Sequence, residues 1–298
     1  MQNVILISSN DLMHISAKKI LTEAQVNGYA VGAFNTVNLE TTWAILEAAA
    51  DRRSPVIIQM TEKTFQYGGG HAMYHLVKNI ADFYFPDIPL AIHLDHGRNI
   101  AVVREALAIG FKSVMMDAST LPYEENEEAT AMIVREAHTK GATVQGELGN
   151  VPYKGEVTDM EHMDWDKYMT NPAQADAYVR STGVDTLAVG IGNAHGSFPE
   201  RPLPDFDRLA AIRERIKLPL VLHGASDWEG EKVARVIGLG VACFNVETAT
   251  KTAFITTLRE TLPMNEAIDI RKILMPARES FREAVKKKMD LFGSTGKA

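Results

Sequence analysis

Cysteine is almost absent from this sequence, which has one, Cys243, among 298 residues. A single thiol cannot form an internal disulfide, and disulfides are rare in the reducing cytoplasm. Long apolar runs are absent too, since none approaches the roughly 20 residues of a membrane span. The apolar stretch 4–7 is too short for the core of a signal peptide and follows no basic cluster. We therefore expect a cytoplasmic protein with neither a membrane span nor a secretion signal.

Positive charge is in the minority. Lysine and arginine together number 31 against 38 aspartates and glutamates, which gives a formal net charge of −7. A chain with this balance has no general basic surface, which argues against nucleic acid or an anionic membrane as its main partner. Any anionic substrate must then be held by local groups.

No low-complexity linker interrupts the chain, and its 46% hydrophobic and 23% charged residues are typical of a globular protein. Short, continuously apolar runs alternate with amphipathic stretches such as 39–53, 101–109 and 126–138. This pattern is expected when helices cover both faces of a parallel sheet. It predicts a (β/α)8 TIM barrel with a C-terminal helical extension, forming one domain over residues 1–298. The eight strands are expected at 29–35, 55–61, 89–95, 113–117, 142–147, 186–192, 219–223 and 241–246.

Polar residues stand where the predicted strands end, and in this barrel the active site is built at the C-terminal ends of the strands. One or two such residues would be ordinary, because Asn and Asp favour turns and helix caps. A full ring of them indicates a functional site. Its members are Asn35, Thr61, Asp95 with His96, Asp117, Glu147, Asn193 with His195, His223 and Asn245.

Three of these residues, His96, His195 and His223, are each followed by glycine, which lets the backbone turn sharply near a ligand. Three neutral imidazoles converging from strand ends would hold a catalytic zinc ion and leave one coordination position for a substrate oxygen. His93 alternates with Asp95 and is expected to be a core or supporting group. The other histidines fall in predicted helices or loops, where solvated or packed side chains are expected: His14, His71, His75, His138 and His162.

Six motifs follow one another along the chain: Ala-Phe-Asn-Thr-Val-Asn at 33–38, His-Leu-Asp-His-Gly at 93–97, Ser-Val-Met-Met-Asp-Ala-Ser at 113–119, Gly-Glu-Leu-Gly at 146–149, Ile-Gly-Asn-Ala-His-Gly at 191–196 and Leu-His-Gly-Ala-Ser at 222–226. This ordered set resembles that of the class II, zinc-dependent ketose-bisphosphate aldolases, which include fructose- and tagatose-bisphosphate aldolase. The resemblance implies a barrel that cleaves a ketose 1,6-bisphosphate into dihydroxyacetone phosphate and an aldehyde, or condenses the two.

The resemblance also implies roles for the polar strand ends. The three glycine-flanked histidines would be the zinc ligands, and Glu147 would be an alternative ligand or a carboxylate beside the metal. Asp95 would be the general acid and base at the hydroxyl whose proton leaves during cleavage. Asp117 would orient a histidine ligand, although a buried helix cap is an equal alternative. An additional monovalent cation is a further implied cofactor.

The chemistry of the implied reaction also calls for a metal. Cleaving a carbon–carbon bond beside a carbonyl leaves a carbanion, which a metal at the substrate oxygens can stabilise as an enediolate. A Schiff base would do the same but needs a lysine at the active-site mouth of the barrel. Lys112 and Lys217 precede the fourth and seventh predicted strands, at the opposite mouth.

Phosphate groups need donors, which backbone N–H groups after the seventh and eighth strands of such barrels commonly provide. A second phosphate needs a cation, and Arg271 stands in Asp-Ile-Arg, which resembles the family's Asp-Pro-Arg segment. That arginine often comes from a neighbouring subunit, so we expect a homodimer or homotetramer; a solvated helix residue is the alternative. The other substrate-binding residues implied are Asn35, Thr61, Gly196, Gly224, Ala225, Ser226, Asn245, Val246, Glu247 and Thr248.

The segment from 151 to about 165 departs from the family's glycine pair and acidic cluster and is long and polar. In the family it carries a glutamate that moves the proton on the dihydroxyacetone carbon. Glu156, Asp159 and Glu161 are the candidates here, and Glu156 is preferred.

Two further departures bear on the substrate. Asp227 stands where the family commonly has glycine and adds a like charge beside a proposed phosphate loop, and Phe198-Pro199 replaces the usual Tyr-Lys. An aldolase acting on another phosphorylated ketose is therefore an alternative. Two other functions are alternatives. The protein could be a TIM-barrel metallohydrolase using zinc-bound water, but such an enzyme would not need paired phosphate loops. It could be a noncatalytic partner subunit, but such a subunit would not need Asp95 and the three histidines.

Overall fold

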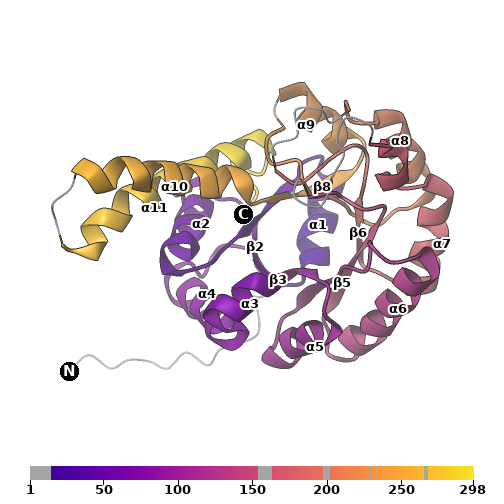
Figure 1. The fold of residues 1–298 in the computed structure, drawn as a ribbon, viewed down its shortest axis with the longest axis horizontal. Coiled ribbons are helices and arrows are strands. Elements are labelled where there is room, and N and C mark those ends of the chain that lie inside the picture. Colours follow the sequence, from indigo (N-terminus) through magenta and orange to yellow (C-terminus); the bar gives the residue numbers. More distant parts are fainter. Residues whose placement is uncertain (1–14, 154–162, 197–201, 229, 265–267) are drawn as a thin grey trace.

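A computed structural model describes residues 15–153, 163–196, 202–228, 230–264 and 268–298 (Figure 1). Within these ranges eight parallel strands form a closed barrel, in which each strand pairs with the next and β8 pairs with β1. The predicted (β/α)8 fold is confirmed. The strands are β1 (Val31–Asn35), β2 (Val56–Thr61), β3 (Leu90–Gly97), β4 (Ser113–Met116), β5 (Thr143–Leu148), β6 (Thr186–Val189), β7 (Leu220–Leu222) and β8 (Val241–Val246).

Helices surround the strands, and their starts are set by local capping (Figure 1). Asn38 begins the helix after β1, because its side chain accepts a hydrogen bond from Thr41 N at 3.0 Å in a capping box. The predicted helical stretches are confirmed to within three residues at their ends. The helices between strands are α2 (Leu39–Arg52), α3 (Glu62–Gly68), α4 (Gly70–Tyr84), α5 (Ile100–Ile109), α6 (Tyr123–Thr139), α7 (Pro172–Thr182), α8 (Phe206–Arg215) and α9 (Gly230–Gly238).

An N-terminal helix, α1 (Ala17–Val26), covers the N-terminal mouth of the barrel, a feature that the sequence pattern did not predict. Its buried Ile20 and Leu21 pack with small barrel residues such as Ala91 in one apolar cluster. Lys18 Nζ donates to Asp185 Oδ1 at 2.9 Å and ties the helix to the start of β6. Because this mouth is filled, a substrate must enter at the C-terminal ends of the strands.

The C-terminal extension consists of α10 (Thr248–Thr261) and α11 (Ile270–Leu291), which lie side by side and project from one flank of the barrel (Figure 1). The inner part of α11 packs on α2, where Lys286 Nζ pairs with Asp51 Oδ2 at 2.7 Å. The outer part extends beyond the barrel. This arrangement confirms the predicted helical extension.

Two strand ends differ from prediction at the site. β6 ends at Val189 instead of 192, and Gly192, at φ +95°, is no longer extended. β3 continues to Gly97, and its pairing with β4 shifts register between Leu94 and Gly97. His96 has φ +48° there. In a regular strand Asp95 and His96 would face opposite sides, so this left-handed residue brings both side chains to one site.

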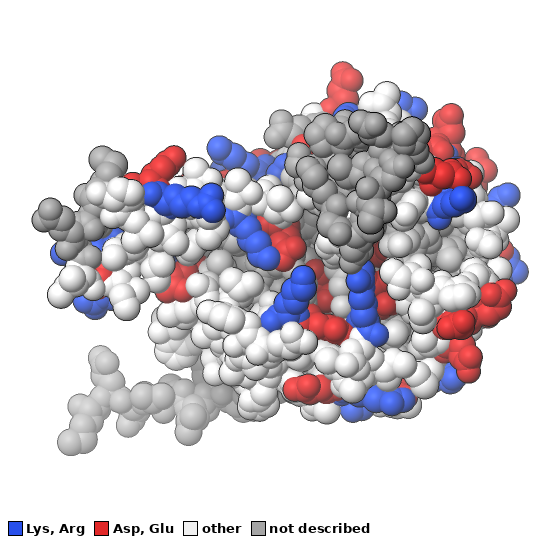
Figure 2. Space-filling view, viewed as in Figure 1, with Lys and Arg blue, Asp and Glu red and all other residues white. Residues whose placement is uncertain are grey.

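Charges of both signs are interspersed on the face of the molecule shown in Figure 2. Lysine and arginine do not gather there into one continuous patch. Among the described residues, no helix combines the length and the apolar character needed to span a bilayer.

Candidate active site

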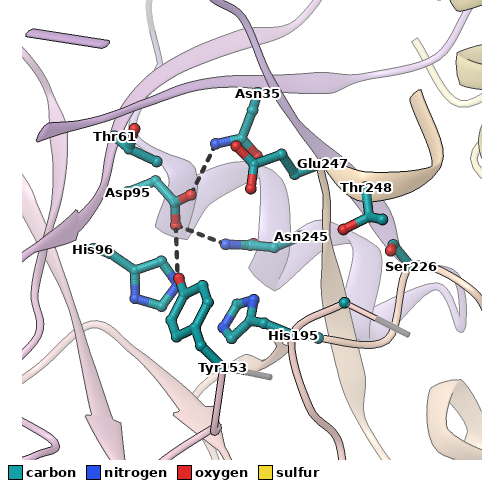
Figure 3. Close-up of a pocket in the computed structure, with 12 residues that line it drawn as sticks. Asn35, Thr61, Asp95, His96, Tyr153, His195, Ser226, Asn245, Glu247 and Thr248 are labelled. Carbon is teal, nitrogen blue, oxygen red and sulfur yellow. Dashed lines mark hydrogen bonds and ion pairs between the residues drawn. The ribbon is translucent and has the colours of Figure 1, made fainter. Parts of the chain in front are cut away.

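A cavity of about 280 Å³ opens at the C-terminal ends of the strands (Figure 3). Tyr153 is the one described lining residue that the sequence did not predict. The cavity is lined by Asn35, Thr61, Asp95, His96, Tyr153, His195, Gly196, Gly224, Ser226, Asn245, Glu247 and Thr248.

The barrel brings His96, His195 and His223 together from three different strand ends. His96 Nε2 lies 2.9 Å from His223 Nδ1. The His195 ring centroid is 5.1 Å from that of His96 and 6.0 Å from that of His223. One nitrogen from each residue lies within 4.8 Å of the others. Three imidazoles can thus reach a single ion.

Two of these imidazoles are held neutral. Burial lowers the pKa of His195 and His223 well below the usual value, and the charge of His96 acts in the same direction. His195 Nε2 is also buried and has no hydrogen-bond partner among the described residues. A buried polar nitrogen without a partner is rare in folded proteins. His195 therefore has a ring nitrogen that is not engaged by the protein, as a metal ligand needs.

His96 is oriented by Asp117, whose Oδ2 lies 2.8 Å from His96 Nδ1. Burial opposes protonation of His96, but the carboxylates of Asp95 and Asp117 outweigh it and raise its pKa to about 9. Asp117 also accepts hydrogen bonds from Arg98 Nε at 3.0 Å and Ser119 Oγ at 2.7 Å. Of the two predicted roles for Asp117, the geometry favours orientation of the histidine, with Nε2 left facing His223.

Glu147 lies beside the histidines. Its Oε1 accepts a hydrogen bond from Val151 N at 3.1 Å, and its Oε2 lies 3.7 Å from His223 Nδ1. Oε2 is buried and has no hydrogen-bond partner among the residues described. Burial and the charge of Asp117 raise the pKa of Glu147 to about 7. This carboxylate could hold a metal in a second position or balance its charge.

Asp95 is one of two carboxylates in the described cavity lining, with Glu247, and amide groups surround it (Figure 3). Asn35 Nδ2 donates to its Oδ2 at 3.0 Å, and Asn245 Nδ2 donates to its Oδ1 at 2.9 Å. Burial raises the pKa of Asp95 in spite of these bonds and the nearby His96. An Asp with a raised pKa can both accept and release a proton near neutral pH.

The predicted phosphate loops lie at the same mouth but divide into two groups. Gly196, Gly224 and Ser226 line the cavity, as do Asn245, Glu247 and Thr248. Ala225 and Val246 are buried behind this surface. Asp227 is exposed and does not line the cavity.

Arg271 lies apart from these residues within one chain. It stands near the start of α11, where its side chain is 87% exposed and pairs with Asp269 at 3.0 Å. The predicted catalytic residue Glu156 lies outside the described residues, together with Asp159, Glu161 and Phe198-Pro199.

Four residues that contact the site were not predicted from the sequence. Gln59 Nε2 donates to Asn35 Oδ1 at 2.8 Å, and Gln145 Nε2 lies 3.1 Å from His223 Nε2. Each is a polar side chain within an apolar strand run, a signal that could have been followed. The other two, Arg98 and Tyr153, lie in loops after strands and are placed by tertiary contacts.

Gly224 is required by the close approach of two loops, and we expect Gly224→Ala to disturb the histidine cluster. Gly224 has φ +59°, and a Cβ would lie 2.4 Å from the carbonyl carbon of Ala194, next to His195. We expect the free energy of unfolding of the variant to fall by ~1–3 kcal/mol, and we expect the variant to bind metal more weakly. Thermal unfolding and the metal content of the purified protein would measure these effects. Gly141→Ala is the matched control, because Gly141 has φ +65° but a Cβ added there would meet nothing within 4 Å. Equal metal content in both variants would contradict this prediction.

Comparison with known proteins agrees with this geometry. The family model described as fructose-bisphosphate aldolase class-II matches residues 15–297. A fructose-bisphosphate aldolase from Thermus caldophilus is 41% identical over 310 residues, covering 96% of this chain and 100% of that protein. The crystal structure of the YdjI aldolase from Escherichia coli K12 has a TM-score of 0.83 at 29% identity, covering 96% of this chain and 100% of that one. Fructose-bisphosphate aldolase from Campylobacter jejuni shares the fold, with a TM-score of 0.81 at 23% identity over 96% of this chain and 97% of that one.

Proposed function

We propose, since this chain belongs to the class-II fructose-bisphosphate aldolase family, that it is a zinc-dependent aldolase of ketose 1,6-bisphosphates of the fructose or tagatose type. Membership of the family makes it a lyase of carbohydrate metabolism. The products would be dihydroxyacetone phosphate and an aldehyde, and the reverse condensation would use the same site. The observation that carries the proposal is the convergence of three histidines beside Asp95.

The donor set fits zinc. His96, His195 and His223 would hold the ion, with Glu147 as an alternative ligand. Nitrogen donors in a set of three leave a coordination position open, as catalytic zinc sites do. When bound, the metal supplies positive charge that offsets the negative charge developing on the substrate oxygens during cleavage.

Asp95 would move the proton at the substrate hydroxyl. As the carbon–carbon bond breaks, its carboxylate takes the hydroxyl proton, and in the condensation it returns the proton. Asn35 and Asn245 hold the two carboxylate oxygens in place through their amide groups. We assign the second proton transfer, at the dihydroxyacetone carbon, to Glu156.

The enzyme would assemble as a homodimer or homotetramer through the α10–α11 extension, because the described lining of the cavity contains neither lysine nor arginine. Arg271 of a neighbouring subunit would supply the missing cation. Apolar side chains exposed on the same extension support a contact between subunits. They are Ile255, Leu262, Ile268, Ile270 and Met275.

If Arg271 binds a second phosphate, Arg271→Ala should raise KM for bisphosphates by at least roughly tenfold and leave ketose monophosphates nearly unchanged. The reason is that a charge-assisted contact to the far phosphate exists only with the bisphosphate. Steady-state kinetics on both substrate types would measure this. Lys272→Ala, which removes the neighbouring exposed charge, is the control. Equal losses for both substrate types would mean that Arg271 does not contact the phosphate.

A panel of ketose mono- and bisphosphates, assayed for triose phosphate release with and without a chelator, tests the proposed function. We expect release from a ketose 1,6-bisphosphate that the chelator abolishes. If the protein cleaves only another phosphorylated ketose, the proposed aldol cleavage would stand and the proposed substrate would be wrong. Hydrolysis without carbon–carbon cleavage would replace the proposal.

We also propose a cytoplasmic location, because the lone Cys243 is a free, buried thiol.

A further inference from the structure

Tyr153 is fixed against the histidine cluster by backbone contacts. It lies just after β5 and forms a parallel bridge with His195. His195 N donates to Pro152 O at 2.8 Å. On the other side, Val151 N donates to Glu147 Oε1 at 3.1 Å. The segment 151–153 is thus attached to two proposed metal-binding residues.

The Tyr153 ring lies flat on the His195 imidazole. The two ring centroids are 4.0 Å apart and the planes differ by 5°. The same ring meets His96 edge-on at 6.0 Å, and Arg98 Cζ lies 5.6 Å from its centroid. A planar contact of this kind restricts rotation of the imidazole about its side-chain bonds, because any tilt would lose contact with the tyrosine face.

His195 needs such a restraint more than its two neighbours do. The side chain of Asp117 holds His96, and the amides of Gln145 and Asn245 lie 3.1 Å from His223 Nε2. The His195 ring, by contrast, makes no hydrogen bond among the described residues: only its backbone N–H bonds, to Pro152 O, and its Nε2 is buried without a partner. Hydrogen bonds usually fix the orientation of a metal-binding histidine. Here the flat contact with Tyr153 orients a ring that no side-chain hydrogen bond among the described residues orients.

We propose that Tyr153 is a positioning residue for His195, whose ring holds the imidazole in the plane in which it can share a metal ion with His96 and His223. The ring, not the hydroxyl, carries this role. The inference rests on the proposed metal dependence. It adds a residue to the site from the segment in which this chain departs from the family pattern.

The test compares Tyr153→Ala with Tyr153→Phe in the full-length protein. Zn²⁺ affinity is measured by competition with a chromophoric chelator, and ligand geometry by the visible spectrum of the Co²⁺-substituted protein. We expect Tyr153→Ala to bind Zn²⁺ roughly 10–100-fold more weakly, the range for loss of a group that orients a metal ligand, with an altered Co²⁺ spectrum. Tyr153→Phe retains the ring and should restore both to wild-type values.

Tyr67→Ala is the control, because Tyr67 is 81% exposed and does not line the cavity. If Tyr153→Ala does not fold, Tyr153→Leu carries the same expectation, since it keeps apolar volume without a planar face. Wild-type affinity and spectrum in the folded variant would overturn the inference, as would a Tyr153→Phe variant as weak as Tyr153→Ala. A wild-type protein that binds no Zn²⁺ would overturn the metal dependence itself and the inference with it.

Discussion

Replacing His195 by alanine is expected to lower kcat/KM for bisphosphate cleavage by at least roughly 10³-fold, or about 4 kcal/mol of transition-state stabilisation. The remaining two histidines cannot hold the ion in the same position, so the charge that offsets the developing negative charge is lost. His195 stands in a loop beyond β6 and is only partly buried, so the barrel should stay folded. Kinetics, metal analysis and thermal unfolding of the purified variant would measure these effects.

His75→Ala is the matched control, because His75 lies on α4 and does not line the cavity. It should retain full activity and metal content. Chelation should inactivate the wild-type enzyme, and added zinc should restore it. Full activity in metal-free protein would contradict the prediction.

The second large effect is expected from Asp95→Ala, which should lower kcat by roughly 10²–10⁴-fold, the usual range for losing one positioned proton-transfer group. The metal should remain bound, because the histidine side chains and Glu147 are unchanged. Steady-state kinetics at saturating substrate, together with the metal content of the same preparation, would measure both quantities.

The combination of these two readouts separates proton transfer from structure. Loss of bound metal in Asp95→Ala would make Asp95 a structural support of His96, whose Nε2 lies 3.9 Å from Asp95 Oδ1. Near-normal turnover would remove Asp95 from the mechanism. His93, two residues before Asp95 on β3, is buried, and its Nδ1 lies 2.7 Å from Ser113 Oγ. This contact agrees with the predicted supporting role of His93, which includes no part in the reaction.

Much of the barrel could be predicted because its signals are local. Continuous apolar runs mark strands covered on both faces, and all eight predicted strands are present in the described structure. The helix α1 was not predicted, although its buried residues Ala17, Ile20, Leu21 and Ala24 recur at helical spacing after the N-cap Ser16. Its position at the barrel mouth depends on contacts with residues from several strands far apart in the sequence. That residues 1–298 form a single domain stays a prediction.

The candidate site was predictable in its members but not in its contacts. Parallel strands place all their C-terminal ends at one mouth, so polar residues there must meet. The sequence does not show which of these residues touch. His96 and His223 lie 127 positions apart and meet only because the barrel closes. Gln59 and Gln145 became part of the site through strand register, which the apolar pattern does not specify for a strand covered on both faces.

The fold class, the ring of polar strand ends and the residue types that suit a metal-dependent aldolase follow from the amino-acid sequence alone, because each of these depends on short-range pattern and residue chemistry. Three other features depend on contacts in the folded barrel: the left-handed backbone of His96, the pairing of Asp117 with that histidine and the stacking of Tyr153 on His195. Those features arise from a register shift and from loops that meet across the barrel mouth. Arg271 shows the same limit, because its Asp-Ile-Arg motif could be read from the chain while its distance from the cavity within one subunit could not.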